Sequence, residues 1–158
     1  MMFQKISQKI LWIATIAVLI ICAVQGISGH WVTFYLIWPG SESSGQTFLR
    51  AMKDLANYHK AAGVSVGVLS ILILILAFGS RPSIYVRIMA LIGLALTVVT
   101  IIGAYKYVSS GFLDRWSLGQ MADGFVGVFA AYFLQLLLML KTPAFLLHRG
   151  KARNISKS

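Results

Sequence analysis

The sequence predicts an all-α integral membrane protein, folded as an up-down-up-down bundle of four helices with both termini in the cytoplasm. Three observations lead to this fold class. Of the 158 residues, 58% are hydrophobic and only 11% are charged, whereas about a quarter of the residues of a soluble domain are charged. The mean hydropathy is accordingly high, at +0.81. The apolar residues also fall into four long runs, and the cations are distributed unevenly among the segments that join them.

The apolar runs cover residues 10 to 38, 58 to 78, 84 to 108 and 118 to 140. Each reaches or exceeds the roughly 20 residues that a helix needs to cross about 30 Å of hydrocarbon. We therefore expect one transmembrane domain over residues 1 to 140 and a basic cytoplasmic tail over residues 141 to 158. The first run begins like a signal peptide, after Lys5 and Lys9, but stays apolar as far as Trp38. That length predicts a retained helix.

The net charge of +10 is explained by membrane topology. Nine of the 14 cations precede the first run, join the second to the third, or follow the fourth, where no acidic residue accompanies them: Lys5, Lys9, Arg81, Arg87, Lys141, Arg149, Lys151, Arg153 and Lys157. The acidic residues lie in or beside the other two links: Glu42, Asp54, Asp114 and Asp123. This positive-inside asymmetry predicts a multi-pass protein of the cell membrane with cytoplasmic termini. Nucleic-acid binding is disfavoured, because the cations are dispersed over three short segments.

One face of the first helix consists of small residues and a single imidazole: Ala23, Gly26, His30 and Thr33. We expect this face to look into the bundle, because large aliphatic residues such as Ile20 and Ile27 lie on other faces. His30 then has two interpretations. It either hydrogen-bonds to a carbonyl or a serine of a neighbouring helix, or it acts as a ligand or proton carrier, since intramembrane ionisable groups are often functional.

A break at Pro39-Gly40 follows the first run, and small polar residues continue it to Gly45. Apolar residues then recur at helical spacing from Phe48 to His59, opposite charged ones. This pattern predicts an amphipathic helix that leads into the second span. It either lies on the outer membrane surface or extends the span outward.

The clearest candidate site begins the second run. His59, Gly63 and Gly67 follow one another at four-residue spacing, so they share one helical face. Gly63 and Gly67 have the spacing of a GxxxG motif, which lets a neighbouring backbone approach closely. The alternative is a haem site. His59 and His30 are expected at similar depths in the outer half of the bundle, where two facing imidazoles could ligate a haem iron.

The glycines have a role in that alternative. A porphyrin is flat and wide, so helices that hold it need short side chains beside the ligand. Gly63 lies one turn from His59, and Gly26 lies one turn from His30. The candidate haem site therefore comprises His59 and His30 as metal ligands, with Gly63 and Gly26 making room for the ring.

The His59-x-x-x-Gly63 opening of the second helix, with Gln25 and Gly29 late in the first, resembles small four-helix membrane proteins of bacteria and archaea with b-type cytochrome character. The resemblance implies a bound haem b. In that family a matching His-x-x-x-Gly often opens the fourth helix.

This chain departs from the pattern at the fourth helix, where Gln120 stands in place of a second histidine. The departure leaves three possibilities for the iron. His30 replaces the missing ligand, the iron is five-coordinate, or a weak ligand such as Met121 completes it.

Two functions follow from the sequence. The first is a small b-type haem protein that relays electrons in a respiratory or other redox membrane complex, with a quinone as a candidate partner. The alternative is a haem-free accessory subunit, whose glycine faces pack on partner subunits or on a second copy of the chain. Catalysis by the chain alone is not expected, because no zinc-type Cys/His set and no phosphate-binding glycine loop occurs. Asp123 is expected to cap the fourth helix, to pair with Lys106 or to relay protons.

Overall fold

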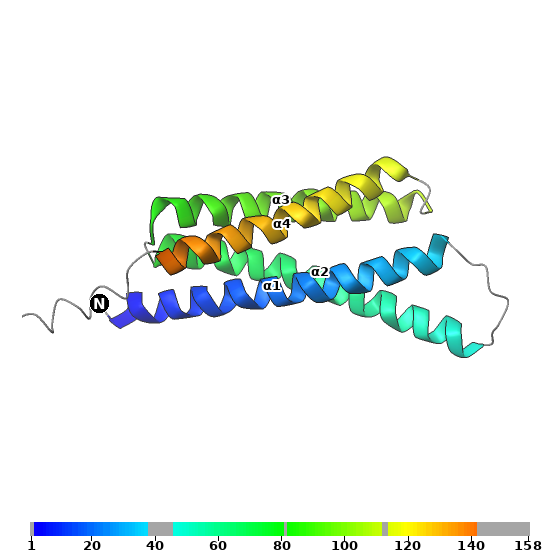
Figure 1. Ribbon diagram of the computed structural model, residues 1–158, viewed down its shortest axis with the longest axis horizontal. Helices are drawn as coiled ribbons and strands as arrows, with labels where there is room; N and C mark the ends of the chain where they lie inside the picture. Colours follow the sequence, from blue (N-terminus) through cyan, green and yellow to red (C-terminus); the bar gives the residue numbers. More distant parts are fainter. Residues whose placement is uncertain (1, 38–45, 81, 112–113, 142–158) are drawn as a thin grey trace, which may run out of the picture.

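The computed structural model describes residues 2–37, 46–80, 82–111 and 114–141. They form four α-helices: α1 (Met2–Ile37), α2 (Gln46–Gly79), α3 (Ile84–Ser109) and α4 (Arg115–Lys141). All four lie along one long axis (Figure 1). Each is long and apolar enough to cross a membrane, with candidate spans at Ile6–Gly29, Asn57–Gly79, Ile84–Ser109 and Arg115–Lys141. The prediction of an all-α membrane protein with four spanning helices is therefore confirmed.

The amphipathic segment before the second span belongs to a single long helix. α2 begins at Gln46 and continues without a break to Gly79. Of the two arrangements expected from the sequence, the structure has the one in which this segment extends the span. His59 therefore lies on a continuous helix, whose backbone hydrogen bonds fix the position of its Cα atom.

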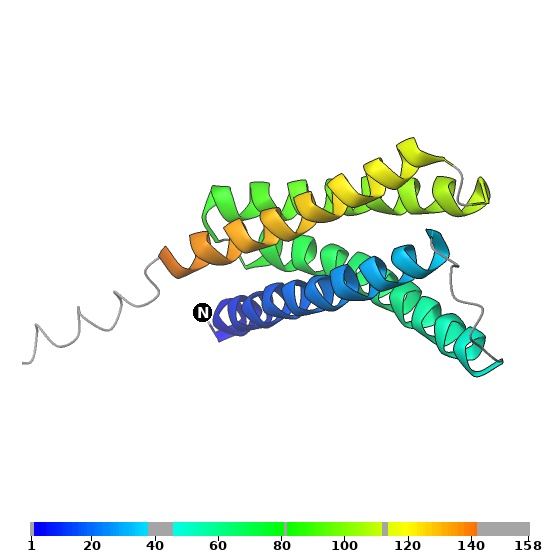
Figure 2. The ribbon, with the colours of Figure 1, turned by 45° about the vertical axis from the view of Figure 1, so that its right-hand side comes forward.

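Within the described residues, each helix packs against two others. The backbones of α1 and α3 each come close to those of α2 and α4, whereas the backbones of the diagonal pairs, α1 with α3 and α2 with α4, do not. The bundle therefore has a cyclic order in which diagonal helices stay apart. The first half of α2 slants away from α3 in both views (Figures 1 and 2). His59, in that half of α2, accordingly has its neighbours Ser28 and Gly29 on α1.

Glycines bring the backbones of α3 and α4 together. A Cβ atom placed on Gly103 would lie 2.8 Å from the backbone nitrogen of Met121 and 3.1 Å from the carbonyl oxygen of Ser117. A Cβ atom on Gly124 would lie 3.2 Å from the backbone nitrogen of Thr100. No larger residue fits at these places unless the helices separate, so these two glycines set the distance between α3 and α4.

A layer of polar side chains crosses the middle of the bundle. Thr15, Ser70, Thr97 and Gln135, one from each helix, are all buried. The Gln135 amide donates to the Thr15 hydroxyl at 3.1 Å, and the Ser70 and Thr97 hydroxyls are 3.1 Å apart. These contacts join α1 to α4 and α2 to α3. Interhelical hydrogen bonds in membranes contribute only about 0.6 kcal/mol each, so they specify which helices are neighbours more than they stabilise the bundle.

The two described members of the small-residue face of α1, Ala23 and Gly26, have different surroundings. Gly26 faces α4, because a Cβ atom there would lie 3.2 Å from the ring of Phe125. Gly29 instead faces α2, and Ala23 is exposed. The expectation that Ala23 looks into the bundle is therefore wrong. The reason is that α1 contacts both α2 and α4 and buries two stripes instead of one.

α4 begins behind an aspartate that caps it. Oδ1 of Asp114 accepts hydrogen bonds from the backbone N–H groups of Trp116 at 3.1 Å and Ser117 at 3.3 Å, and Oδ2 accepts one from the Ser117 hydroxyl. These bonds satisfy donors that the first helical turn leaves free. The hydrogen bonds from Ser117 hold the pKa of Asp114 below its ordinary value of 3.8, and the positive charge of Lys106 acts in the same direction.

We expect this cap to titrate below pH 3.8, the ordinary pKa of the group. A lowered pKa in the folded state means that the ionised cap stabilises α4 above the ordinary pKa and is lost as the pH falls through the lowered value. NMR shifts of the Trp116 and Ser117 amides in detergent measure the midpoint. Ser117→Ala should raise the midpoint, and Asp114→Asn should abolish the titration. A wild-type midpoint at or above the ordinary pKa would contradict this assignment.

Candidate functional site

His59 is held against α1 by a close contact and a hydrogen bond. Its Cε1 atom lies 2.8 Å from the place that a Cβ atom on Gly29 would occupy. Its Nδ1 atom lies 3.2 Å from the hydroxyl oxygen of Ser28. The imidazole therefore occupies a notch that exists only because residue 29 has no side chain. The ring is fixed between α1 and α2, half-buried.

The hydrogen bonds around His59 indicate which nitrogen carries the proton. The Ser28 hydroxyl donates to the carbonyl oxygen of Gln25 at 3.1 Å. A serine hydroxyl has one proton and two lone pairs, so towards His59 it acts as the acceptor. In the tautomer that fits this arrangement, Nδ1 of His59 carries the proton and donates to Ser28. Nε2 keeps its lone pair, which is the form in which a histidine ligates a metal.

The two glycines expected to make room for a porphyrin each have a side chain beside them. The place of a Cβ atom on Gly63 lies 3.0 Å from the amide nitrogen of Gln25, and that on Gly26 lies 3.2 Å from the ring of Phe125. Gln25 reaches Gly63 across the interface between α1 and α2, and Phe125 reaches Gly26 from α4. A porphyrin at either glycine would require these side chains to change rotamer.

For the other candidate ligands the structure gives the helix and, for some, the surroundings of the residue. His30 lies on α1, but its side chain is outside the described residues, and so is its relation to His59. Gln120, at the position where the resemblance leads one to expect a histidine, is partly buried and lines a pocket between α3 and α4. Met121 lies with its backbone against Gly103. Both residues belong to α4, whose backbone does not come close to that of α2 within the described residues.

Ser28 is the residue of this site that sequence reasoning missed. It precedes His59 by 31 positions, and a serine in an apolar run is usually a packing residue. A usable signal was the three-residue spacing of Gln25 and Ser28, which puts both on the face of α1 that meets α2. For Gln25 and Gly29 the signal in the sequence is the resemblance alone.

The described residues contain no group of three or more His, Cys, Asp or Glu side chains that could hold a metal ion. A lone imidazole is nevertheless sufficient for a haem, because the porphyrin supplies four of the iron ligands and the protein only the axial ones. The chemistry open to this site is therefore axial ligation of a prosthetic group, or a helix-to-helix hydrogen bond with no ligand at all.

Comparisons with known proteins found no match: no family model matches the chain, and neither a curated protein nor a solved structure does.

Proposed function

We propose that this chain is a small multi-pass protein of the cell membrane that holds a b-type haem and relays electrons within a redox membrane complex. In this proposal the four helices form an up-down-up-down bundle with both termini in the cytoplasm. The topology is supported by the cations, nine of which lie on the side assigned to the cytoplasm against five on the other. A quinone is the electron-carrying partner that the proposal names.

The observation that carries the proposal is the hydrogen-bond chain from His59 to Ser28 to the carbonyl oxygen of Gln25. It orients the imidazole and leaves the lone pair on Nε2. Histidines that ligate metals usually donate their other N–H in this way, which fixes the tautomer and makes the ligand more basic. Ser28 is therefore the positioning residue for His59.

In the proposed site His59 supplies one axial ligand and His30, on the neighbouring helix, the other. Gly63 and Gly26, which carry no side chain, leave space next to these ligands once Gln25 and Phe125 turn aside. The haem, when bound, supplies one-electron oxidation and reduction. The protein holds it away from water in the apolar bundle and sets its orientation through His59.

A haem-free accessory subunit is the second candidate, and a specific observation favours it. Gln25 and Phe125 already fill the spaces beside Gly63 and Gly26, and His59 already has a neighbour in Gly29 and a partner in Ser28. In this case the site joins α1 to α2, and the outer faces of the bundle bind other membrane subunits or a second copy.

The test is a reduced-minus-oxidised absorption spectrum of the protein, purified in detergent from a haem-replete host. A pyridine haemochrome assay gives the stoichiometry. The proposal predicts a sharp α-band and close to one haem per chain. A featureless spectrum would overturn it and leave the accessory subunit, which is then sought by gentle extraction of the native membrane complex.

A further inference from the structure

Asp123 is an acidic side chain exposed on a membrane-spanning helix. The cap of α4 is Asp114, so Asp123 does not have that role, and the expected pairing with Lys106 is not formed among the described residues. Asp123 follows Arg115, the first residue of α4, by eight positions, about 12 Å along the helix axis. The 27 residues of α4 are about 40 Å long and exceed the hydrocarbon thickness by only about 10 Å. The backbone at Asp123 therefore lies within the hydrocarbon layer.

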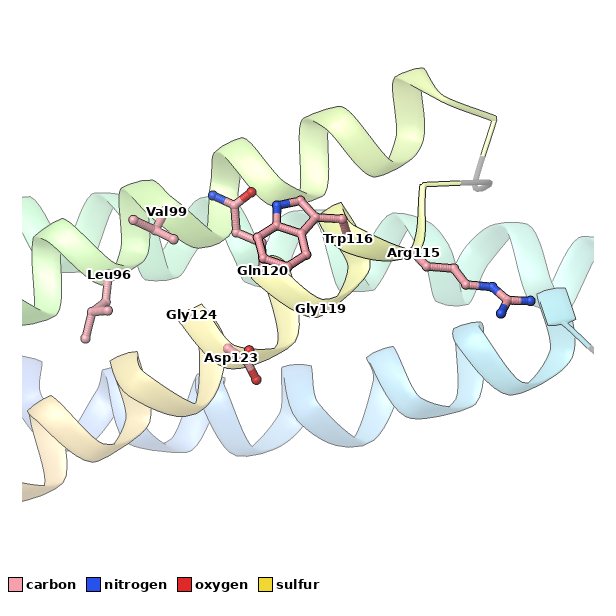
Figure 3. Close-up of a pocket in the computed structure, with 8 residues that line it drawn as sticks. All are labelled: Leu96, Val99, Arg115, Trp116, Gly119, Gln120, Asp123 and Gly124. Carbon is pink, nitrogen blue, oxygen red and sulfur yellow. The ribbon is translucent and has the colours of Figure 1, made fainter.

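No side chain of the described residues neutralises this carboxylate. Figure 3 shows it turned away from the Gln120 amide and the Trp116 indole, although all three residues line the same pocket. The guanidinium of Arg115, which lines that pocket too, also points away from Asp123. A charged group inside a membrane is costly unless it is paired. The charge of Asp123 therefore calls for a partner from outside this part of the chain.

The surface around Asp123 has short side chains. Asp123, Val126 and Ala130 are exposed, and their three- and four-residue spacing puts them on one face of α4. Gly119 lies one turn before Asp123, and a Cβ atom there would meet nothing within 4 Å. Short side chains let the backbone of another helix approach closely. These four residues, the Asp123 face, combine room for a helix with one unpaired negative charge.

A second copy of the chain fits the Asp123 face poorly. In an isologous contact the same surface of each copy meets itself. Two copies inserted in the same direction would then bring their Asp123 carboxylates together inside the hydrocarbon. Like charges at short distance repel most strongly where the dielectric constant is low. The occupant that complements this face therefore carries a positive charge.

We propose that the Asp123 face docks a membrane-spanning helix of another subunit, which places a Lys or an Arg opposite the carboxylate. The cation donates charge-assisted hydrogen bonds to Asp123, and the partner backbone approaches over Gly119 and Ala130. Ionisable groups inside a membrane pair with one another in this way, because either charge alone is costly there. The proposal uses no residue of the haem site, so it holds whether or not the chain binds haem.

A synthetic helix in phosphatidylcholine vesicles tests this pairing. The probe is a membrane-spanning peptide of Leu and Ala with one Lys eight residues from its end, the depth of Asp123 in α4. Matched peptides carry Leu or Glu instead of the Lys. Energy transfer from the labelled protein to each labelled peptide measures affinity. We expect the Lys peptide to bind about tenfold more tightly than the Leu peptide, as for one charge-assisted hydrogen bond, and the Glu peptide to bind no better than the Leu peptide.

Variants of the protein assign this preference to the Asp123 face. Asp123→Asn should remove the preference for the Lys peptide, whereas Asp123→Glu, which keeps the charge, should retain it. Ala130→Leu adds bulk to the docking face and should weaken the binding of the Lys peptide. Ala23→Leu is its matched control, because it makes the same change at an exposed position of α1. It should leave binding unchanged.

Two results with the peptides would overturn the proposal. One is equal binding of the Lys and Leu peptides by the wild-type protein, and the other is a Lys preference that survives Asp123→Asn. Energy transfer between two labelled populations of the chain tests for a second copy as the occupant. Self-association that Asp123→Asn abolishes and the Lys peptide does not displace would assign the face to a second copy and would also overturn the proposal. Should Asp123→Asn not fold, the peptide series with Ala130→Leu and Ala23→Leu gives the same comparison.

Discussion

If the chain holds the proposed haem, replacing His59 with alanine is expected to abolish its absorbance while the bundle still inserts and folds. Among the described side chains, His59 is the one imidazole that lies between α1 and α2. The structural loss is small by comparison. One interhelical hydrogen bond, to Ser28, contributes about 0.6 kcal/mol in a membrane protein. Absorption spectra of the purified variant, with circular dichroism to verify its helicity, measure both effects.

Ser28→Ala tests the hydrogen bond that orients His59 without removing the imidazole itself. The imidazole stays, but Nδ1 loses its acceptor, so we expect the haem absorbance to persist at saturating haem while haem affinity falls about 10- to 100-fold. His148→Ala, in the tail, changes the same residue type outside the described residues and should leave haem binding unchanged. A haem band that persists in His59→Ala would remove His59 from the site.

His30→Ala distinguishes the possible coordination states. If His30 is the second axial ligand, its loss should convert a low-spin spectrum into a high-spin one without emptying the site. If the iron has one protein ligand, the spectrum should stay the same. This comparison matters because the resemblance implies a ligand on the fourth helix, and Gln120 occupies that position.

The helices could be predicted from the sequence with good accuracy, because membrane insertion depends on local composition. The second and third spans, expected over 58 to 78 and 84 to 108, match Asn57–Gly79 and Ile84–Ser109 closely. Each apolar run must satisfy its own backbone hydrogen bonds in lipid, so the run alone determines the helix. The helical character of the amphipathic segment is predicted equally well by its sequence. Its continuity with the second span is not, and only the structure shows it.

The neighbours of individual side chains were much harder to predict, because they depend on how the helices are arranged. His59 and Gly63 share a helical face as expected, but nothing in their spacing says that they meet Ser28, Gly29 and Gln25 of α1. The slant of α2 determines which residues of α1 these two residues meet. That slant depends on packing over the whole length of the bundle. Asp114 and Asp123 illustrate the same limit, because the spacing of residues does not say which of the two caps α4 and which lines the pocket.

A second large effect is expected at Gly103, where alanine should destabilise the bundle by about 1 to 3 kcal/mol, the usual cost of overpacking. The added methyl group would meet the backbone of α4 at Met121 and Ser117. Backbone atoms cannot change rotamer, so α3 and α4 must separate along part of their length. The free energy of unfolding, measured by titrating the detergent-solubilised protein with a denaturing detergent, reports the change.

Gly67→Ala is the control that isolates this cause. It makes the same substitution within a membrane-spanning helix, but the nearest atom to its new methyl group would be Cδ1 of Ile101 at 3.7 Å, an ordinary contact distance. Alanine is the better helix former by about 1 kcal/mol, so Gly67→Ala should leave stability unchanged or raise it. Equal destabilisation by both substitutions would mean that glycine acts through helix flexibility. A loss confined to Gly103→Ala would identify the approach of α3 to α4 as the contact that sets the geometry of the end of the bundle where Gln120 and its pocket lie.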